Sequence, residues 1–397
     1  MNLASPHSKN SRALFSPERL RFTLTEFSGG LGDLGTFIPL AVGVALVSGM
    51  DLPTILIWAG VFSILAGVFF GLPIPIQPMK AIAAVAIAER LTPGAIGASG
   101  VLIGALVFVT GVTGVMKTIN RFVPTPLVRG IQLGVGVKLA ISGLQYIGDT
   151  PLFAFDSVTT AAVLAVMAVA VNRYRKFPAA LVMVLCGVVI VALDLSQTGV
   201  AGDLFEPGLP AFSLISPSAA EWSLGFWEGA LPQLPLTILN SVVAVCALSG
   251  DLFGERKIPQ GKMALAVGAM NLIGAPFGAL PLCHGSGGLA AQHFFGARTG
   301  GAVVMVGALK IAVALAFGSG ITHVLGAFPL SILGVMLFFA GVELALPARD
   351  QTGRGDFFIA LLTAVGIVAI NTGVGFVIGA CGAALWRWIG AGAEQGR

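Results

Sequence analysis

Charged residues are scarce in this sequence. Asp, Glu, Lys and Arg make up 10% of its 397 residues, whereas soluble globular domains carry roughly a quarter. The four cysteines, at positions 186, 246, 283 and 381, have neither metal-ligand spacing nor the pattern of a disulfide framework, so we expect small buried thiols, no metal and no cofactor. Residues 1–20 are polar and lack an apolar stretch, so no cleavable signal peptide is expected.

Apolar residues dominate instead. The chain is 56% hydrophobic, contains 54 glycines and has a mean hydropathy of +0.93. At about 20 residues per crossing it has room for roughly 12 to 14 spans. The sequence therefore predicts an all-α polytopic membrane protein whose surroundings are the lipid bilayer. A net charge of +4 is not read as a nucleic-acid signature, because the charges follow membrane topology.

Fourteen membrane segments can be placed along the chain. We expect them at about 26–48, 53–71, 75–90, 95–116, 127–147, 157–172, 177–194, 223–249, 262–279, 281–297, 301–318, 321–345, 356–370 and 372–390. A polar, acidic connection covers about 195–220. The spans are apolar on all faces, so periodicity does not fix their rotation.

The distribution of Lys and Arg predicts the orientation. With the N-terminus inside, Arg90 is the one basic residue that falls outside, and Lys80, Lys138 and Lys310 lie within spans. All other basic residues fall on the cytoplasmic side. Removing either broken segment from the count inverts every later loop and spoils this separation. We therefore expect fourteen segments and two cytoplasmic termini.

Two of the fourteen segments are broken. The third contains Pro75-Ile-Gln-Pro-Met-Lys80, and the tenth contains Pro281-Leu-Cys-His-Gly-Ser286. Each is the third segment in a group of seven. Because seven is odd, the second group starts on the opposite side of the membrane and is inverted relative to the first. Paired interrupted segments at corresponding positions indicate a transporter site near the midplane. Helix N-termini starting there, around His284 or Gly285 in the tenth segment, would aim unpaired N–H groups and positive dipole ends at an anion.

Polar residues within the spans are the candidate site. Glu26 and Asp33 lie in the first span, seven residues apart, and are expected on one helix face. Lys80 would add positive charge to the helix dipole, or instead neutralise Asp33. Gln77 could donate hydrogen bonds.

The eighth segment carries Gln233, Thr237 and Asn240 on one face, which could complete the site or hold helices together. His284 could bind an oxyanion or carry a proton. Adjacent Cys283 and His284 point apart, so enzyme chemistry is not expected. Lys138 and Lys310 fit pairing or snorkelling better than substrate contact.

Three stretches resemble the molybdate transporter family of plants, algae and bacteria, which is related to SulP-type sulfate permeases. They are Glu26-Phe-Ser-Gly-Gly-Leu-Gly-Asp-Leu-Gly-Thr-Phe-Ile-Pro-Leu40, Pro73-Ile-Pro-Ile-Gln-Pro-Met-Lys80 and Pro281-Leu-Cys-His-Gly-Ser-Gly-Gly-Leu-Ala-Ala-Gln-His-Phe-Phe-Gly-Ala-Arg-Thr-Gly300. The resemblance extends over essentially the whole membrane region and implies a seven-plus-seven inverted repeat, in which a core domain moves against a gate domain. Many SulP proteins add a C-terminal STAS domain, and none is expected here.

The resemblance also implies domain limits and site residues. The expected parts are a tail at 1–21, core at 22–118 and 222–319, gate at 119–195 and 320–391, an outer loop at 196–221 and a tail at 392–397. The implied substrate-binding residues are Ser28, Gly29, Asp33, Gln77, Met79, Lys80, Gln233, Thr237, Asn240, His284, Gly285, Ser286 and Gly287.

The resulting hypothesis is a secondary transporter of a tetrahedral oxyanion, molybdate first and sulfate second. Glu26, Asp33 and His284 are the candidates for proton coupling. The alternatives are a permease of the same fold for a nucleobase or carboxylate, and a passive anion channel. We expect a bacterial inner membrane as the location, with a homodimer as the candidate assembly.

Overall fold

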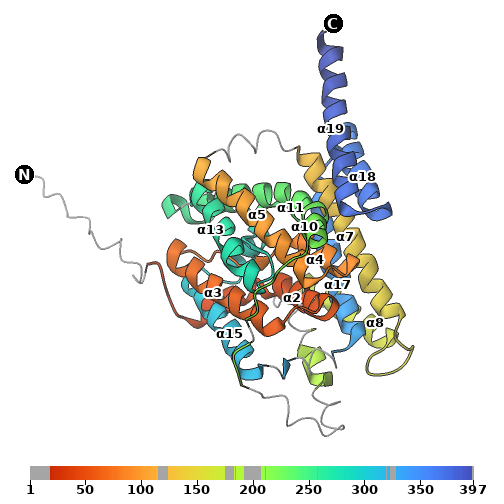
Figure 1. Cartoon of the computed structure of the whole chain (residues 1–397). Helices are drawn as coiled ribbons and strands as arrows, with labels where there is room; N and C mark the ends of the chain where they lie inside the picture. The colour runs from red at the N-terminus through yellow and green to blue at the C-terminus, as the bar shows by residue number, and fades with distance from the viewer. Residues whose placement is uncertain are drawn as a thin grey trace, which may run out of the picture.

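The computed structural model describes residues 18–114, 124–174, 183, 185–191, 207–210, 212–256, 258–318, 320–321 and 328–395. The predicted N-terminal tail to residue 17, most of the predicted seventh span, and residues 196–206 and 211 of the predicted outer loop lie outside this part. Nearly all regular structure is helical (Figure 1).

Within the described residues, the first half of the chain supplies seven helices and one short strand. They are α1 (Leu24–Leu31), α2 (Leu34–Ser48), α3 (Leu52–Phe70), β1 (Gln77–Pro78), α4 (Lys80–Glu89), α5 (Pro93–Thr113), α7 (Thr125–Gly148) and α8 (Val158–Tyr174). The predicted boundaries are right to within a few residues, because turn-forming Gly and Pro flank most of these helices.

The second half begins with one long, irregular helical stretch, Ala219–Phe253. It comprises α10 (Ala219–Leu224), the π-helical η3 (Gly225–Ala230), α11 (Leu231–Leu236), the π-helical η4 (Thr237–Ala244) and α12 (Val245–Phe253). Pro232 and Pro235 have no N–H to donate, and the two π-helical stretches lie directly before and after the short helix that contains them. The sequence predicted that Gln233, Thr237 and Asn240 share one face of a regular α-helix. Thr237 and Asn240 lie in the π-helical η4, so that α-helical spacing does not apply from Thr237 onward.

The remaining elements follow in order. They are α13 (Gln260–Gly274), β2 (Leu282–Cys283), α14 (Ser286–Phe294), α15 (Gly301–Phe317), α17 (Leu330–Ala345), the 3₁₀ turn η7 (Leu346–Asp350), α18 (Arg354–Ala369) and α19 (Thr372–Gln395). The twelfth span was predicted from residue 321, whereas its helix α17 begins at Leu330. Pro329 is its N-cap residue, with an extended backbone, and a proline has no N–H with which to continue a helix from an earlier turn.

The first span is not one straight helix. Leu24–Leu31 and Thr36–Ser48 meet at an angle of 51°. Gly32 and Asp33 fill the break between α1 and α2, because glycine weakens a helix and Asp favours the N-cap position. The prediction that Glu26 and Asp33 share one helix face is therefore wrong, since they belong to different helices.

The two broken segments meet, as predicted, and do so through backbone pairing. β1 and β2 are antiparallel, with Gln77 opposite Cys283 and Pro78 opposite Leu282. The N–H of Met79 donates to the carbonyl of Pro281 at 2.8 Å. On the other side of β2, the side-chain amide of Asn271 on α13 pairs with the backbone of Leu282. Its Oδ1 accepts a 2.8 Å hydrogen bond from the N–H of Leu282, and its Nδ2 donates one of 2.7 Å to the carbonyl. Extended backbone inside a membrane protein thus has its polar groups satisfied by protein.

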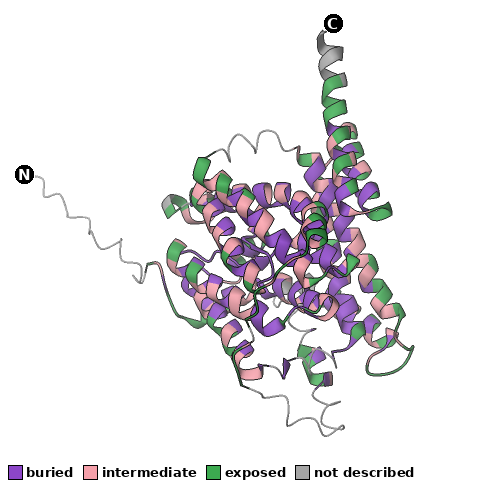
Figure 2. Cartoon of the chain, in the orientation of Figure 1, coloured by how far each residue is buried: buried purple, intermediate pink, exposed green. Residues whose placement is uncertain are grey.

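The helices form two groups around these segments (Figure 1). In one group α15 packs on α3, α13 on α5, and α1 on α14 and α15; in the other α17, α18 and α19 pack on α7. The half-helix α4 packs against α2, α5 and α7, and every residue from Ala81 to Ile87 is buried. Figure 2 shows buried residues concentrated at the centre and exposed ones on the outer helices.

The chain is a helical membrane protein. Five described helices are long and apolar enough to cross a bilayer, and the bent first pair adds a sixth. The five are Leu52–Phe70, Pro93–Thr113, Thr125–Gly148, Ala219–Phe253 and Leu330–Asp350. Shorter apolar helices include Val158–Ala170 and Gly301–Phe317. The count of fourteen segments in an inverted repeat stays a prediction.

Candidate functional site

A cavity of about 1020 Å³ lies between the two groups of helices. One wall comes from the α1–α2 break, α2, α4, η4 and α14, and the other from α7, α8, α17 and η7. Most of the lining is apolar. Its polar side chains are Thr36, Lys80, Thr125, Arg129, Gln132, Asn240, Ser286 and Glu343.

Lys80 supplies a positive charge to the cavity wall. It is the first residue of α4 and is half-buried, because the β1–β2 pairing ends just before it. Within the described part of the chain its ammonium has neither a hydrogen bond nor an ion pair; Asp33, the predicted alternative partner, bonds Gln77 instead. A cation without a counter-ion at membrane depth is costly and marks a functional position.

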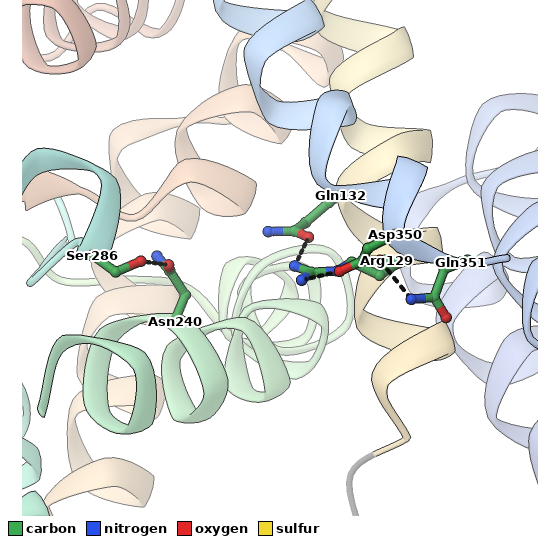
Figure 3. A network of polar contacts seen from close by, with 6 residues as sticks. All are labelled: Arg129, Gln132, Asn240, Ser286, Asp350 and Gln351. Atoms are coloured by element: carbon green, nitrogen blue, oxygen red, sulfur yellow. Dashed lines mark hydrogen bonds and ion pairs between the residues drawn. The ribbon is translucent and has the colours of Figure 1, made fainter. Parts of the chain in front are cut away.

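The first turn of α14 lines the same cavity. Gly285 is its N-cap residue, and Ser286 and Gly287 are its first two helical residues, which confirms the predicted start of this half-helix. The N–H groups at the start of a helix have no partner inside the helix, and the helix dipole is positive there. Ser286 Oγ donates a 2.6 Å hydrogen bond to Oδ1 of Asn240 on η4 (Figure 3). Backbone amides, a hydroxyl and an amide side chain are thus gathered at one end of α14.

The three glycines of this turn have different surroundings. A Cβ at Gly285 would collide with Oε1 of Gln77, and a Cβ at Gly288 would collide with Gln77 and with Oδ1 of Asp33. A Cβ at Gly287 would meet nothing within 4 Å, because this residue borders the cavity. Gly285 and Gly288 therefore allow close packing, whereas Gly287 leaves open space beside the helix terminus.

Asp33 and Gln77 lie directly behind this wall. Both side chains are buried, and Nε2 of Gln77 donates a short hydrogen bond to Oδ1 of Asp33. Oε1 of Gln77 has no hydrogen-bond partner among the described residues. Asp33 is not among the lining residues, although Gly32 and Thr36 on either side of it in sequence are, and its carboxylate packs against Gly288 of α14.

Several other predicted residues also lie outside the cavity lining. Gln233 accepts a 3.0 Å hydrogen bond from the N–H of Ala81, in the first turn of α4, and donates one of 3.0 Å to Thr237. Nδ1 of His284 lies 3.0 Å from the carbonyl of Pro75, while its buried Nε2 has no hydrogen-bond partner in the described part of the chain.

Ser28 is exposed, Gly29 packs against Ala297, and Met79 is fully buried. Of the thirteen predicted residues, the structure therefore brings Lys80, Asn240, Ser286 and Gly287 to the cavity surface.

Glu26 has a backbone partner rather than a place in the cavity lining. Its Oε2 accepts hydrogen bonds from the N–H groups of Arg298 and Thr299, at 2.9 and 3.1 Å, shortly before α15. Lys138 pairs with Glu89, as the sequence suggested, and this ion pair joins α7 to the end of α4.

Sequence reasoning missed the opposite wall of the cavity. There Arg129 of α7 donates to Asp350 of η7, at 2.9 Å from Nε, and to Oε1 of Gln132, at 3.0 Å (Figure 3). Figure 3 shows this group across from Ser286 and Asn240. The available signal was the position of Arg129 just inside the predicted fifth span, where it was counted only as a cytoplasmic charge.

The chemistry of the lining suits an anion. Lys80 and Arg129 are cationic, Ser286 and Asn240 are neutral hydrogen-bonding groups, and Glu343 is acidic. Among the described residues no three His, Cys, Asp or Glu side chains lie close enough together to hold a metal ion.

Two solved structures have a similar fold. The transmembrane domain of a cyanobacterium bicarbonate transporter, BicA, superimposes with a TM-score of 0.64 at 16% identity, covering 89% of this chain and 96% of that one. Murine Solute Carrier 26 family member A9 anion transporter in the inward-facing state gives a TM-score of 0.70 at 14% identity, with 93% and 69% covered. At such identities the likeness shows the fold alone.

Sequence comparison is more specific. Molybdate transporter 1 and molybdate transporter 2 of Arabidopsis thaliana are each 37% identical to this chain, covering 92% and 91% of it and 91% and 86% of the relatives. Molybdate transporter 1 of Chlamydomonas reinhardtii is 33% identical, with 92% and 91% covered. The model of the family described as "Molybdate transporter of MFS superfamily" matches residues 25–139 and 225–344. The chain is a membrane transporter rather than an enzyme, and it belongs to the molybdate transporter family.

Proposed function

We propose that this protein carries a tetrahedral oxyanion across the membrane by alternating access, with molybdate as the first cargo and sulfate as the second. The observation that carries the proposal is the Lys80 ammonium, which has no hydrogen bond or ion pair to a described residue and lies in the same cavity as the N-terminal turn of α14. The similarity to molybdate transporters of plants and algae supports this choice of cargo.

The oxyanion would be bound at the first turn of α14. The N–H groups of Ser286 and Gly287 would donate to its oxygens, as helix N-termini commonly do for phosphate and sulfate groups. Ser286 and Asn240 would add side-chain hydrogen bonds, and Lys80 would offset the charge. This arrangement uses the tetrahedral shape and the negative charge of the cargo.

The proposed state is open to the cytoplasm. The cavity is lined by the first part of α7, the last part of α17 and the whole of α14, whose ends lie on the predicted cytoplasmic side. Toward the predicted outer side, Glu89 pairs with Lys138. Glu228 of η3 accepts hydrogen bonds from the N–H groups of Thr372 and Gly373 at the start of α19, at 2.9 and 3.3 Å.

These outer contacts join the proposed core to the proposed gate. Glu89 and Glu228 fall in the core ranges 22–118 and 222–319, whereas Lys138 and Thr372 fall in the gate ranges 119–195 and 320–391. Outward opening would separate the two groups and break the contacts. Alternating access thus has a defined outer seal in this proposal.

Transport of a dianion into a negative-inside cell needs a coupling ion. The membrane potential opposes entry by about 2.3 kcal/mol per charge per 100 mV. We assign proton coupling to Asp33, because Glu26 is occupied by two backbone N–H groups and His284 contacts Pro75, whereas the residues around Asp33 in sequence, Gly32 and Thr36, line the cavity. A bacterial inner membrane, cytoplasmic termini and a homodimer remain predictions.

Uptake by proteoliposomes of the purified chain tests this function. Molybdate should accumulate with a proton gradient and resist an excess of sulfate; uptake that sulfate abolishes would indicate a general sulfate-type permease. Molybdate uptake that is insensitive to both the proton gradient and an uncoupler would refute proton coupling. If folded protein takes up neither oxyanion, a nucleobase or carboxylate becomes the better candidate. Large single-channel currents without coupling would indicate a channel.

A further inference from the structure

A lysine that the proposed function does not use lies deep in the protein. Lys310 is in the middle of α15 and is only 5% exposed. Its Nζ lies 3.8 Å from the centroid of the Phe37 ring, a cation–π contact. Within the described residues it has neither a hydrogen bond nor an ion pair. One aromatic ring does not compensate the desolvation of an ammonium ion, so a nearby negative charge would favour the charged form of this lysine.

Asp33 is that charge. The N–H of Phe37 donates to the carbonyl of Asp33, so the residue whose ring Lys310 contacts lies one helical turn along the chain from Asp33. Lys310 and Lys80 both act electrostatically on Asp33, and the effect of Lys310 is the larger. The two opposite charges are buried near each other without direct contact.

The groups around Asp33 come from five elements. Gln77 of β1 donates to the carboxylate, and Gly288 of α14 packs against it. The two lysines act on it from α4 and α15, and it acts electrostatically on Cys283 of β2. Its neighbourhood therefore contains two cations, neutral polar groups and no second carboxylate among these contacts. Whether Asp33 is charged consequently decides the net charge of the site.

We propose that Lys310 is the charge partner that makes uptake of one proton accompany uptake of one dianion, an inference that rests on the proposed function. With Asp33 ionised, Lys80, Lys310 and Asp33 sum to one positive charge. When Asp33 takes a proton from the outer solution, the sum is two positive charges, equal and opposite to a tetrahedral dianion. Release of the dianion to the cytoplasm lets the proton leave Asp33, and the buried pair is restored.

This role differs from that of Lys80. Lys80 lies in the cavity wall and would contact the oxyanion, whereas Lys310 is behind it and acts through the electric field. Removing Lys310 should therefore alter the pH dependence and the proton stoichiometry of transport as well as affinity. A purely structural lysine would change the stability of the protein and leave those two quantities unchanged.

The experiment uses proteoliposomes of the full chain, with molybdate uptake and internal acidification measured together between pH 5 and 8. The wild type should gain about tenfold in apparent affinity per unit of falling pH over the range in which one proton is taken up, with one proton per molybdate. Lys310→Met should flatten that dependence, lower the proton-to-molybdate ratio and weaken affinity at least tenfold at pH 5. Lys310→Arg, which keeps the charge, should restore the ratio, and Lys262→Met, outside the cavity lining, is the matched control.

Asp33→Asn provides an independent arm that does not depend on Lys310 variants folding. It should exchange molybdate across the membrane with no pH dependence and move no protons. Wild-type pH dependence and stoichiometry in Lys310→Met, or pH-dependent exchange in Asp33→Asn, would overturn the role of Lys310 while leaving molybdate transport intact. Absence of molybdate uptake by the folded wild type would instead refute the proposed function itself.

Discussion

Replacing Lys80 by Gln should weaken oxyanion binding more than any other single change of side chain in the cavity wall. The substitution keeps a polar side chain of similar length and removes one positive charge from the start of α4. Because Lys80 makes no hydrogen bond or ion pair with any described residue, and Asp33 keeps its hydrogen bond to Gln77 and the charge of Lys310, the loss of Lys80 breaks no direct contact. The effect should therefore appear in binding and leave folding largely unchanged.

The magnitude follows from Coulomb's law. Two unit charges about 4 Å apart interact with about 1 kcal/mol in bulk water and about 4 kcal/mol at an effective dielectric constant of 20. A dianion doubles these values to about 2 and 8 kcal/mol. Lys80 is half-buried beside an open cavity, so the lower figure is a reasonable minimum. Since 1.4 kcal/mol is a factor of ten, we expect affinity to fall at least roughly 30-fold.

Isothermal titration calorimetry with molybdate on the detergent-solubilised protein measures this directly. Lys80→Arg, which retains the charge, should bind within about tenfold of the wild type, and Lys262→Gln removes a lysine that does not line the cavity. Raising the salt concentration should narrow the difference between Lys80→Gln and the wild type, because screening weakens the lost interaction. Binding by Lys80→Gln within threefold of the wild type would refute the assignment of Lys80 to the site.

Three further predictions concern the framework of the site. Glu89→Gln should loosen the outer seal, so amide hydrogen exchange at the end of α4 should rise, and Lys138→Met should give the same pattern; unchanged exchange in both would contradict a seal at this position. Gly285→Ala should lower the apparent melting temperature in detergent by several degrees, because its Cβ collides with a buried amide, whereas Gly287→Ala should melt like the wild type. Asn271→Ala should lower the stability of the protein by about 2 to 4 kcal/mol, because the buried N–H and carbonyl of Leu282 lose their hydrogen-bond partner. A melting curve that matches the wild type would show that other contacts hold β2 in place.

The positions of the helices and of both breaks could be predicted from the sequence, because they depend on local chemistry. Proline removes a backbone donor and glycine destabilises a helix wherever they occur. The interruptions before Lys80 and before Ser286 can therefore be recognised from the sequence alone. The late start of α17 and the bend at Gly32 were missed. Apolar sequence before Pro329 hides the first, whereas the glycines around Gly32 also fit close packing between helices and did not by themselves indicate a bend.

The side of each helix that borders the cavity could not be predicted. All spans are apolar, so no periodic pattern distinguishes a lipid-facing side from a protein-facing one. Gln77 was expected to contact substrate and instead bonds Asp33, and His284 lies against Pro75. Arg129 lay near a span end, where basic residues are common, so nothing in the sequence separated it from a topological charge. These contacts are set by packing between segments far apart in the chain.

The two half-helices also differ in a way that their symmetric positions conceal. In the first turn of α4 the N–H of Ala81 is already bonded to Gln233, so this terminus contributes mainly the charge of Lys80. In the first turn of α14 the residue Gly287 has open space beside it, so this terminus can offer backbone N–H groups to an oxygen. An oxyanion should therefore bind asymmetrically, closer to α14 than to α4. Charge and hydrogen bonding would then come from different halves of the chain, and because α4 and α14 both fall in the proposed core ranges, the two would move together against the gate.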